Sequence, residues 1–253
     1  MCSRVAVWLA RLPNSAGCCR NSVAGMSAMN RIRVVIAGCI FLLAAVCQAA
    51  EPYSIAVLKE APTGLAPQIL EKLETTGYRI SGKDVVCDLW LVKEATLKAK
   101  FQSTEQVRYP FAPGSLLGAM RFPETAEPGD FRGQNIKPGT YTLRYGLQPN
   151  DGNHLGTSDV RDFALCCPPK EDMDPKPVTP MSALFKLSAK SAGTTHPAVF
   201  LLAPPPEESH GEPSVKMNEE KHQLVISVNA NGKSGDKAVK FPLELVALGK
   251  SEG

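Results

Sequence analysis

Proline and glycine interrupt much of this sequence from Tyr109 onwards, and this spacing limits the elements that it can form. A helix in a globular protein usually needs an unbroken stretch of about 8 to 20 residues, whereas strands of about 4 to 8 residues fit between such turns. Helical and extended patterns do not alternate along the chain, which argues against a parallel nucleotide-binding sheet. The sequence therefore predicts a mainly β fold, an antiparallel β-sandwich with two short helices.

The predicted strands are stretches that alternate or are continuously apolar between turn signals. They cover residues 53–59, 78–82, 84–92, 115–122, 139–148, 161–166, 198–202, 223–229 and 238–248. The two predicted helices cover residues 65–73, where leucine and isoleucine recur at helical spacing, and residues 181–190, which follow Thr179-Pro180. Asn231-Gly232 predicts the hairpin between the last two strands, and residues 170–180 are interpreted as a charged linker.

Residues 29–52 have the order of a secretory signal. Arg31 and Arg33 precede fourteen uncharged residues, 34–47, and Gln48-Ala49-Ala50 follows them. This apolar run is shorter than the ~20 residues that span a membrane. We expect cleavage after Ala49 or Ala50, which makes residues 1–50 an N-terminal extension and signal peptide. Two alternatives are lipid attachment at Cys47 and retention of the run as an uncleaved anchor.

The expected mature chain, residues 51–253, is long enough for a single domain. The first fifty residues contain five arginines and no acidic residue, so residues 51–253 carry 23 basic and 25 acidic side chains, a net charge of −2. Nucleic-acid binding requires a concentrated cationic surface, and this balance argues against it. We expect a secreted, periplasmic or cell-surface domain that has no stable membrane span after signal cleavage.

Three cysteines, Cys87, Cys166 and Cys167, fall in the expected mature chain. Adjacent residues of a strand point to opposite faces, so only one of Cys166 and Cys167 can face Cys87 across a core. The first interpretation is that all three are small buried apolar residues. The alternatives are a disulfide between Cys87 and one of the pair and metal or redox chemistry, which the missing C-x-x-C spacing disfavours.

One segment resembles a known family. The run Pro138-Gly-Thr-Tyr-Thr-Leu-Arg-Tyr145 is similar to a strand of bacterial transthyretin-like and carboxypeptidase-regulatory-like sandwich domains. The longer run from Pro138 to Phe163 resembles a group of secreted bacterial proteins of unknown function. The resemblance implies a sandwich fold, an exported protein and an aromatic side chain packed in the core. It implies no catalytic residue.

The densest polar cluster covers residues 150–162. Asp151, Asn153, Gly156, Asp159 and Asp162 fall at positions 1, 3, 6, 9 and 12 of a calcium-loop register. The match fails at position 5, which is Leu155, and at position 12, where Asp162 replaces the long bidentate glutamate. The cluster is therefore a candidate metal site formed by Asp151, Asn153, Asp159 and Asp162, with calcium as the ion. The alternative is that these residues only satisfy the backbone of their own turns.

The same region predicts a site for a polar ligand. Loop-borne polar groups beside an aromatic residue on a rigid sheet make a suitable site, and the candidate residues are Arg144, Tyr145, Asn153, His154 and Asp162. Facing outward, Arg144 would be an ordinary solvated side chain; facing inward, it would need a carboxylate partner. Trp90 is expected to pack against the core, and its alternative role is a platform for a sugar.

No motif in the sequence specifies a reaction, because G-x-S-x-G, H-E-x-x-H and phosphate-binding glycine loops are missing. The predicted function is therefore that of an exported, non-catalytic binding or structural module for a polar ligand or a cell-envelope component. The alternative is a metal-assisted hydrolase that uses His154 with Asp151, Asp159 or Asp162 of the polar loop. The two hypotheses differ in geometry, because an enzyme needs several of these groups to converge in a concave site.

Overall fold

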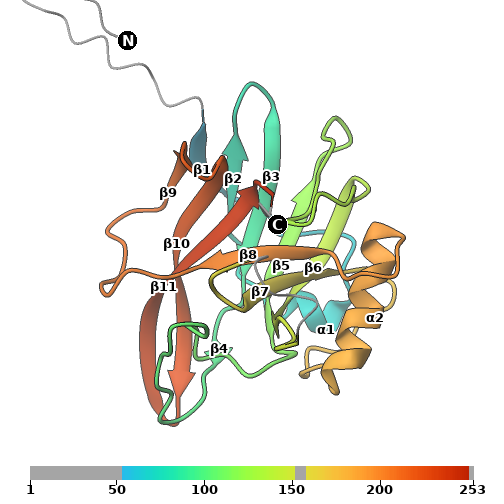
Figure 1. Ribbon diagram of the computed structural model, residues 1–253. Coiled ribbons are helices and arrows are strands. Elements are labelled where there is room, and N and C mark those ends of the chain that lie inside the picture. Colours follow the sequence, from blue (N-terminus) through green and yellow to red (C-terminus); the bar gives the residue numbers. More distant parts are fainter. Residues whose placement is uncertain (1–52, 152–157, 251–253) are drawn as a thin grey trace, which may run out of the picture. The chain divides into compact units, whose positions relative to one another are not determined.

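The segments between the prolines and glycines fold as strands in the computed structural model, which describes residues 53–151 and 158–250 (Figure 1). Strands make up 42% and helices 8% of this part, which confirms the mainly β class with two helices. The strands are β1 Ser54–Leu58, β2 Gly77–Ser81, β3 Val85–Leu91, β4 Ala95–Thr96, β5 Leu116–Phe122, β6 Gly139–Leu147, β7 Asp162–Cys167, β8 Val199–Ala203, β9 Ser214–Asn218, β10 Gln223–Ser234 and β11 Lys237–Leu248. The helices are α1 Pro67–Leu70 and α2 Met181–Ala192.

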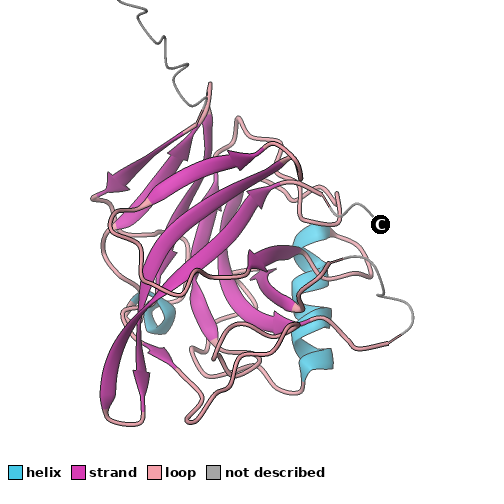
Figure 2. Cartoon of the chain, turned by 60° about the vertical axis from the view of Figure 1, so that its left-hand side comes forward, coloured by secondary structure: helices cyan, strands magenta, loops and turns pink. Residues whose placement is uncertain are grey.

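The eleven described strands form one continuous sheet. Their order is β1-β2-β3-β5-β6-β7-β8-β11-β10-β4, and β9 pairs with β10 as well. Every pairing is antiparallel except the short contact between β10 and β4. The sheet curls until it is nearly closed (Figure 2), and its first strand, β1, comes to lie beside β9.

Alternation along the strands produces two apolar clusters, one on each face of the sheet. The larger cluster fills the inner face and takes side chains from almost every strand, including Leu89, Leu143 and Leu245. The smaller cluster lies on the outer face, where Leu165 of β7 and Leu184 of α2 pack together. Figure 1 shows α2 beside β6 and β7, where it covers this part of the outer face.

The two helices differ in how well the sequence defines their ends. Helix α2 ends at Gly193, whose φ of +66° suits a left-handed cap that other residues adopt only with strain. Helix α1 is shorter than predicted, because Leu73 leaves the helix and forms a bridge with Val92. Ile69 and Leu73 are still buried in the inner cluster, so the apolar pattern predicted burial correctly and helix length poorly.

The predicted position of the last hairpin is wrong. Asn231 and Gly232 lie within β10 and pair with Lys240 and Val239 of β11, and the chain turns instead between Ser234 and Lys237. A Cβ atom at position 232 would lie 2.8 Å from the Phe241 ring and 2.9 Å from Leu97. Gly232 therefore serves close packing rather than a turn.

The cysteines and Trp90 are buried, as their first interpretation predicted. Cys87 and Cys166 belong to the inner cluster and Cys167 to the outer one, so the adjacent pair does point to opposite faces. All three are free thiols in this structure, and the alternative disulfide is not formed. Trp90 is fully buried and donates from Nε1 to the carbonyl of Glu60 at 2.8 Å.

Residues 48–253 form one compact unit. The expected signal peptide and cleavage site lie outside the described residues. Within residues 53–151 and 158–250, no helix has both the length and the apolar character to cross a membrane.

Candidate functional site

Arg144, a predicted ligand-binding residue, is fully buried on the outer face of β6. Its Nε and Nη2 atoms donate to the Asp172 carboxylate at 2.6 and 2.7 Å. Nη1 donates to the carbonyls of Gly114 at 2.9 Å and Lys176 at 2.8 Å, and Nη2 also donates to that of Asp174. Of the two predicted alternatives, the structure has the buried arginine paired with a carboxylate, although Arg144 is buried beneath residues 170–178 rather than inside the curled sheet. The pair ties residues 170–178, interpreted from the sequence as a linker, to the sheet.

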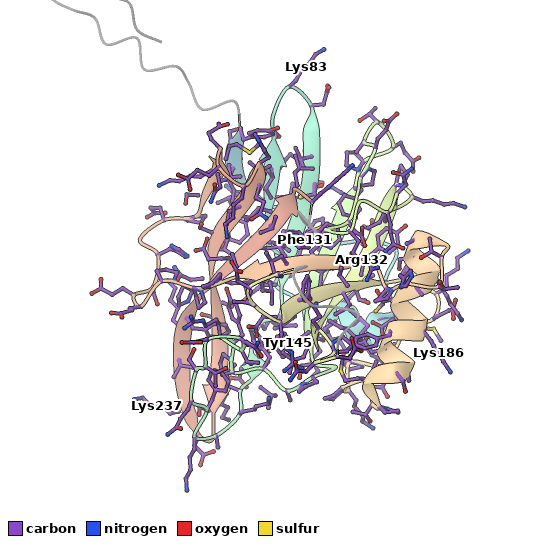
Figure 3. The ribbon with its side chains drawn as sticks, viewed as in Figure 1. Lys83, Phe131, Arg132, Tyr145, Lys186 and Lys237 are labelled. Atoms are coloured by element: carbon purple, nitrogen blue, oxygen red, sulfur yellow. The ribbon has the colours of Figure 1, made fainter. Side chains whose placement is uncertain are left out.

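Tyr145 and Asp162, two further predicted residues, meet inside the sheet. The Tyr145 hydroxyl donates to Asp162 Oδ1 at 2.5 Å, and both side chains are fully buried. Asp162 also accepts from the backbone N–H groups of Arg108 at 2.7 Å and Tyr109 at 3.3 Å. Burial is the main cause that raises the pKa of Asp162, and it also raises that of Tyr145. Figure 3 shows Tyr145 among the strands, whereas Lys83 and Lys237 point away from them.

Asn153 and His154, two further predicted site residues, lie outside the described residues. Asp159 has a side chain that is 94% exposed and stands 3.6 Å from the Lys221 ammonium, and Asp151 is exposed. In the part of the chain that the structure describes, no three histidine, cysteine, aspartate or glutamate side chains are grouped to hold a metal ion. Ligand binding by these residues, calcium binding and the hydrolase alternative therefore stay predictions.

A cleft of about 1030 Å³ lies on another part of the molecule. Its walls are residues 126–128, 135–141, 168–171 and 190–193. They belong to the loop before β6, the start of β6, the turn after β7 and the C-terminal turn of α2. The segment from Pro138 to Tyr145, which resembles a strand of bacterial sandwich domains, therefore forms part of a wall. Its first four residues, 138–141, all line the cleft. Ligand sites are typically concave spaces of about this size.

A buried aspartate, Asp130, holds one wall of the cleft. It accepts hydrogen bonds from the backbone N–H groups of Arg132, Gln134 and Val199, and from the side-chain amide of Gln134. Val199 is the first residue of β8. These bonds therefore fix the loop before β6 against the sheet.

A second buried aspartate, Asp172, holds the wall formed by the turn after β7. Besides the Arg144 guanidinium, its carboxylate accepts from the Thr142 hydroxyl of β6. Its backbone N–H donates to the Pro168 carbonyl at 3.0 Å, which closes the turn after β7. The loops that form the cleft are thus ordered by polar contacts made in the interior.

Side-chain hydrogen bonds fix the remaining walls. Tyr141 donates from its hydroxyl to the Lys137 carbonyl at 2.8 Å, which closes the turn at the start of β6. Ser191 of α2 donates to the Cys166 carbonyl at 3.0 Å, and this bond anchors the end of the helix to β7. A site whose walls are fixed before a ligand arrives loses less conformational entropy on binding.

The charges of the cleft are unevenly paired. Lys190 forms an ion pair with Glu171 across the turn. Lys137 and Lys170 are exposed, and neither makes an ion pair within the described ranges. Glu127 is also exposed and makes no ion pair within the described ranges. The cleft therefore offers two lysines and one glutamate to a ligand.

A second polar group lies where the loop before β9 meets β10 and β11. His210 Nε2 stands 2.5 Å from Glu244 Oε1, although without the alignment of a hydrogen bond, and Ser227 donates to Glu244 Oε2 at 2.7 Å. The Asn229 amide bonds both the N–H and the carbonyl of His210. None of these residues lines the cleft. Their contacts fix the loop to the sheet, and two titratable groups are too few to hold a metal ion.

The cleft has no clear signature in the amino-acid sequence. Its residues come from four segments that are distant in the sequence, and most of them are prolines, lysines and small residues that also occur in ordinary turns. One local pattern does point to a wall of the cleft: aspartate, glycine and glutamine occur together around Asp130. Such a pattern is typical of an aspartate that accepts hydrogen bonds from the backbone of its own loop. Comparison of the chain with known protein families, with curated proteins and with solved structures finds no match.

Proposed function

We propose that this chain is an exported, non-catalytic binding module that holds a polar ligand or a cell-envelope component in the cleft beside the start of β6. The observation that carries the proposal is the cleft itself, a space of about 1030 Å³ whose walls are fixed by Asp130, Asp172 and Ser191. Preformed walls favour binding of a ligand without large rearrangement.

The placement of the ionisable groups supports binding over catalysis. Catalytic groups with shifted pKa values are usually open to a cleft. Here Asp162, Tyr145 and Cys87, whose pKa values are raised by burial, are sealed within the sheet. Tyr141 is the residue of the cleft wall whose pKa is raised by burial, and its hydroxyl is already bonded to the Lys137 carbonyl. The exposed ionisable groups of the cleft are lysines and glutamates, which are suited to recognising charge.

Two features of the sequence support an exported role. Residues 29–52 have the order of a secretory signal. The segment from Pro138 to Tyr145 resembles a strand of exported bacterial sandwich domains, and its first four residues line the cleft.

The test is binding to isolated cell envelopes, measured by co-sedimentation of the purified protein. The variant Ala126→Trp places a bulky side chain in a wall of the cleft, and we expect it to abolish binding. The matched control is Ala238→Trp, which adds the same side chain at an exposed position of β11 outside the cleft. Equal binding by both variants, or no binding by the unmodified protein, would overturn the proposal.

A further inference from the structure

We propose that the ligand of the cleft is an acidic glycan, a saccharide chain that carries carboxylate or phosphate groups. This inference rests on the proposed function and specifies the chemistry of its ligand. The cleft offers three kinds of contact to such a ligand: cations, hydrogen-bond acceptors and apolar surface. An acidic glycan has the complement of each.

The cations select the negative groups. Lys137 precedes β6 and Lys170 follows β7, so the two exposed ammonium groups come from two different walls. Arg121 lies one strand away, because it pairs with Thr140 of the cleft wall, but its guanidinium already donates to the Asp88 carboxylate. The two lysines are therefore the cations that the cleft offers, and charge-assisted bonds to carboxylate or phosphate are the strongest contacts that they can make.

The acceptors select hydroxyl groups. The last four carbonyls of a helix have no partner within it, and Lys190, Ser191 and Ala192 at the end of α2 line the cleft. The N–H groups of Gly193 and Thr194 both donate to the carbonyl of Ala189, and among the described residues no backbone N–H beyond the helix donates to these three carbonyls. They can therefore accept from a ligand. The carboxylate of Glu127 is a further acceptor. Sugar hydroxyls are donors, whereas a ligand that offered only anionic oxygens would be repelled by this wall.

The apolar surface suits sugar rings. Pro138, Pro168 and Pro169 line the cleft and are partly exposed, whereas Pro128, Ile136 and Tyr141 also line it but are buried. Rigid proline rings present apolar surface without losing side-chain entropy on binding. The C–H faces of a saccharide ring can lie against them while its hydroxyls reach the acceptors.

A peptide fits the cleft less well. One recurring way of recognising an extended peptide is through an exposed sheet edge, which supplies main-chain hydrogen bonds. The strand that borders the cleft, β6, is paired with β5 on one side and with β7 on the other. It therefore has no free edge to offer, and an acidic peptide would find the lysines but could not add a strand to the sheet.

The test compares four probes by isothermal titration calorimetry with the purified protein. Oligogalacturonate supplies carboxylates on a sugar chain and phosphorylated dextran supplies phosphates. Unmodified dextran is the neutral glycan and poly-L-glutamate is the acidic peptide. We expect binding to an acidic glycan, at least about tenfold weaker binding to the other two probes, and loss of affinity as salt rises from about 0.05 M to about 0.5 M.

Variants separate the cleft from general charge. The double variant Lys137→Ala/Lys170→Ala should weaken binding of the acidic glycan by about tenfold or more, as expected when charge-assisted contacts are lost. The matched control, Lys83→Ala/Lys237→Ala, removes the same charge from two distant hairpins (Figure 3) and should change affinity by less than about twofold. Failure of both acidic glycans to bind, equal binding of poly-L-glutamate, or equal effects of the two double variants would overturn the inference. Envelope binding that Ala126→Trp abolishes would still support the proposed function in that case.

Discussion

Tyr145 on β6 donates a hydrogen bond of 2.5 Å to Asp162 on β7, and neither side chain reaches solvent. The carboxyl group has no ion-pair partner among the described residues and is held by this hydroxyl and two backbone N–H groups. Burial raises its pKa above the ordinary value of 3.8, although the hydrogen bonds oppose the shift. A carboxyl group in this position should link the stability of the fold to pH.

The first prediction concerns Asp162→Asn. A carboxyl whose pKa is raised by folding contributes its stability below the unfolded pKa and loses it as pH rises through the folded pKa. From about pH 3.8 upwards, the free energy of unfolding contributed by Asp162 should therefore fall, by at most about 1.4 kcal/mol per pH unit. The Asp162→Asn variant should lack this fall, although lost hydrogen bonds should lower its stability by about 1–3 kcal/mol at all pH values. Urea denaturation from pH 3 to pH 7 measures both effects.

The control for this prediction is Asp159→Asn, which removes a carboxyl that is 94% exposed. Its pH profile should match that of the unmodified protein. If Asp162→Asn also leaves the slope unchanged, the carboxyl is not linked to folding as proposed.

The second prediction concerns the buried pair of Arg144 and Asp172. Arg144→Met leaves the Asp172 carboxylate buried without its partner and should cost about 3–5 kcal/mol. Adding Asp172→Asn removes the stranded charge, so the double variant should be more stable than the sum of the two single effects predicts. Chemical denaturation of the four proteins measures this coupling. Arg132→Met, at an exposed position, serves as the control, and additivity of the pair would contradict the interaction.

The third prediction concerns Gly77 in β2. A Cβ atom there would lie 2.6 Å from the Leu89 carbonyl and 2.7 Å from the Trp90 ring. Gly77→Ala should therefore cost about 1–3 kcal/mol by overpacking and change the emission of Trp90, the only tryptophan in residues 51–253. Fluorescence-detected unfolding reports both effects. Gly211→Ala, where a Cβ atom meets open space, should stay within about 0.5 kcal/mol of the unmodified protein.

The fourth prediction concerns the three thiols. Burial raises the pKa of Cys87, Cys166 and Cys167, so little thiolate forms at neutral pH. The folded protein that begins near Glu51 should react with no thiol reagent, and after denaturation without reductant it should take up three equivalents. Mass spectrometry counts the labels. A single label would show that two of the cysteines had formed a disulfide.

The fifth prediction concerns the amino terminus. If residues 29–52 act as a secretory signal, the exported protein should begin at Ala50 or Glu51. Its intact mass identifies the cleavage point. Lipid on Cys47 or an uncleaved terminus would contradict this assignment and favour one of the two anchored alternatives.

Much of the fold was predictable because alternation and turn residues act locally. The strands at 84–92 and 139–148 alternate between clear turn signals, and both appear within a residue or two of their expected ends as β3 and β6. Local turn residues gave a wrong prediction at Asn231-Gly232. The chain stays extended there, because Gly232 packs closely against Leu97 and Phe241. Strand β9 was missed because its five residues carry little pattern without their partner, β10.

The candidate site was much less predictable than the fold. The sequence left two alternatives open for Arg144, a solvated side chain or a buried one with a carboxylate partner. Its partner, Asp172, lies in a segment whose composition is that of a linker. Tyr145 and Asp162 were both singled out, yet nothing in the sequence indicates that each satisfies the other. The cleft depends on loops that the buried contacts of Asp130 and Asp172 hold together. Local sequence patterns do not predict contacts between residues that are distant in the sequence.

The meeting of β1 with β9 has a consequence for how the protein is made. The first strand finds its far neighbour only after most of the polypeptide has been synthesised, and contacts between distant segments form slowly. If the chain is exported as proposed, its sheet could close only after β9 had followed β1 through the translocation channel. Closure would then be a step that takes place after translocation.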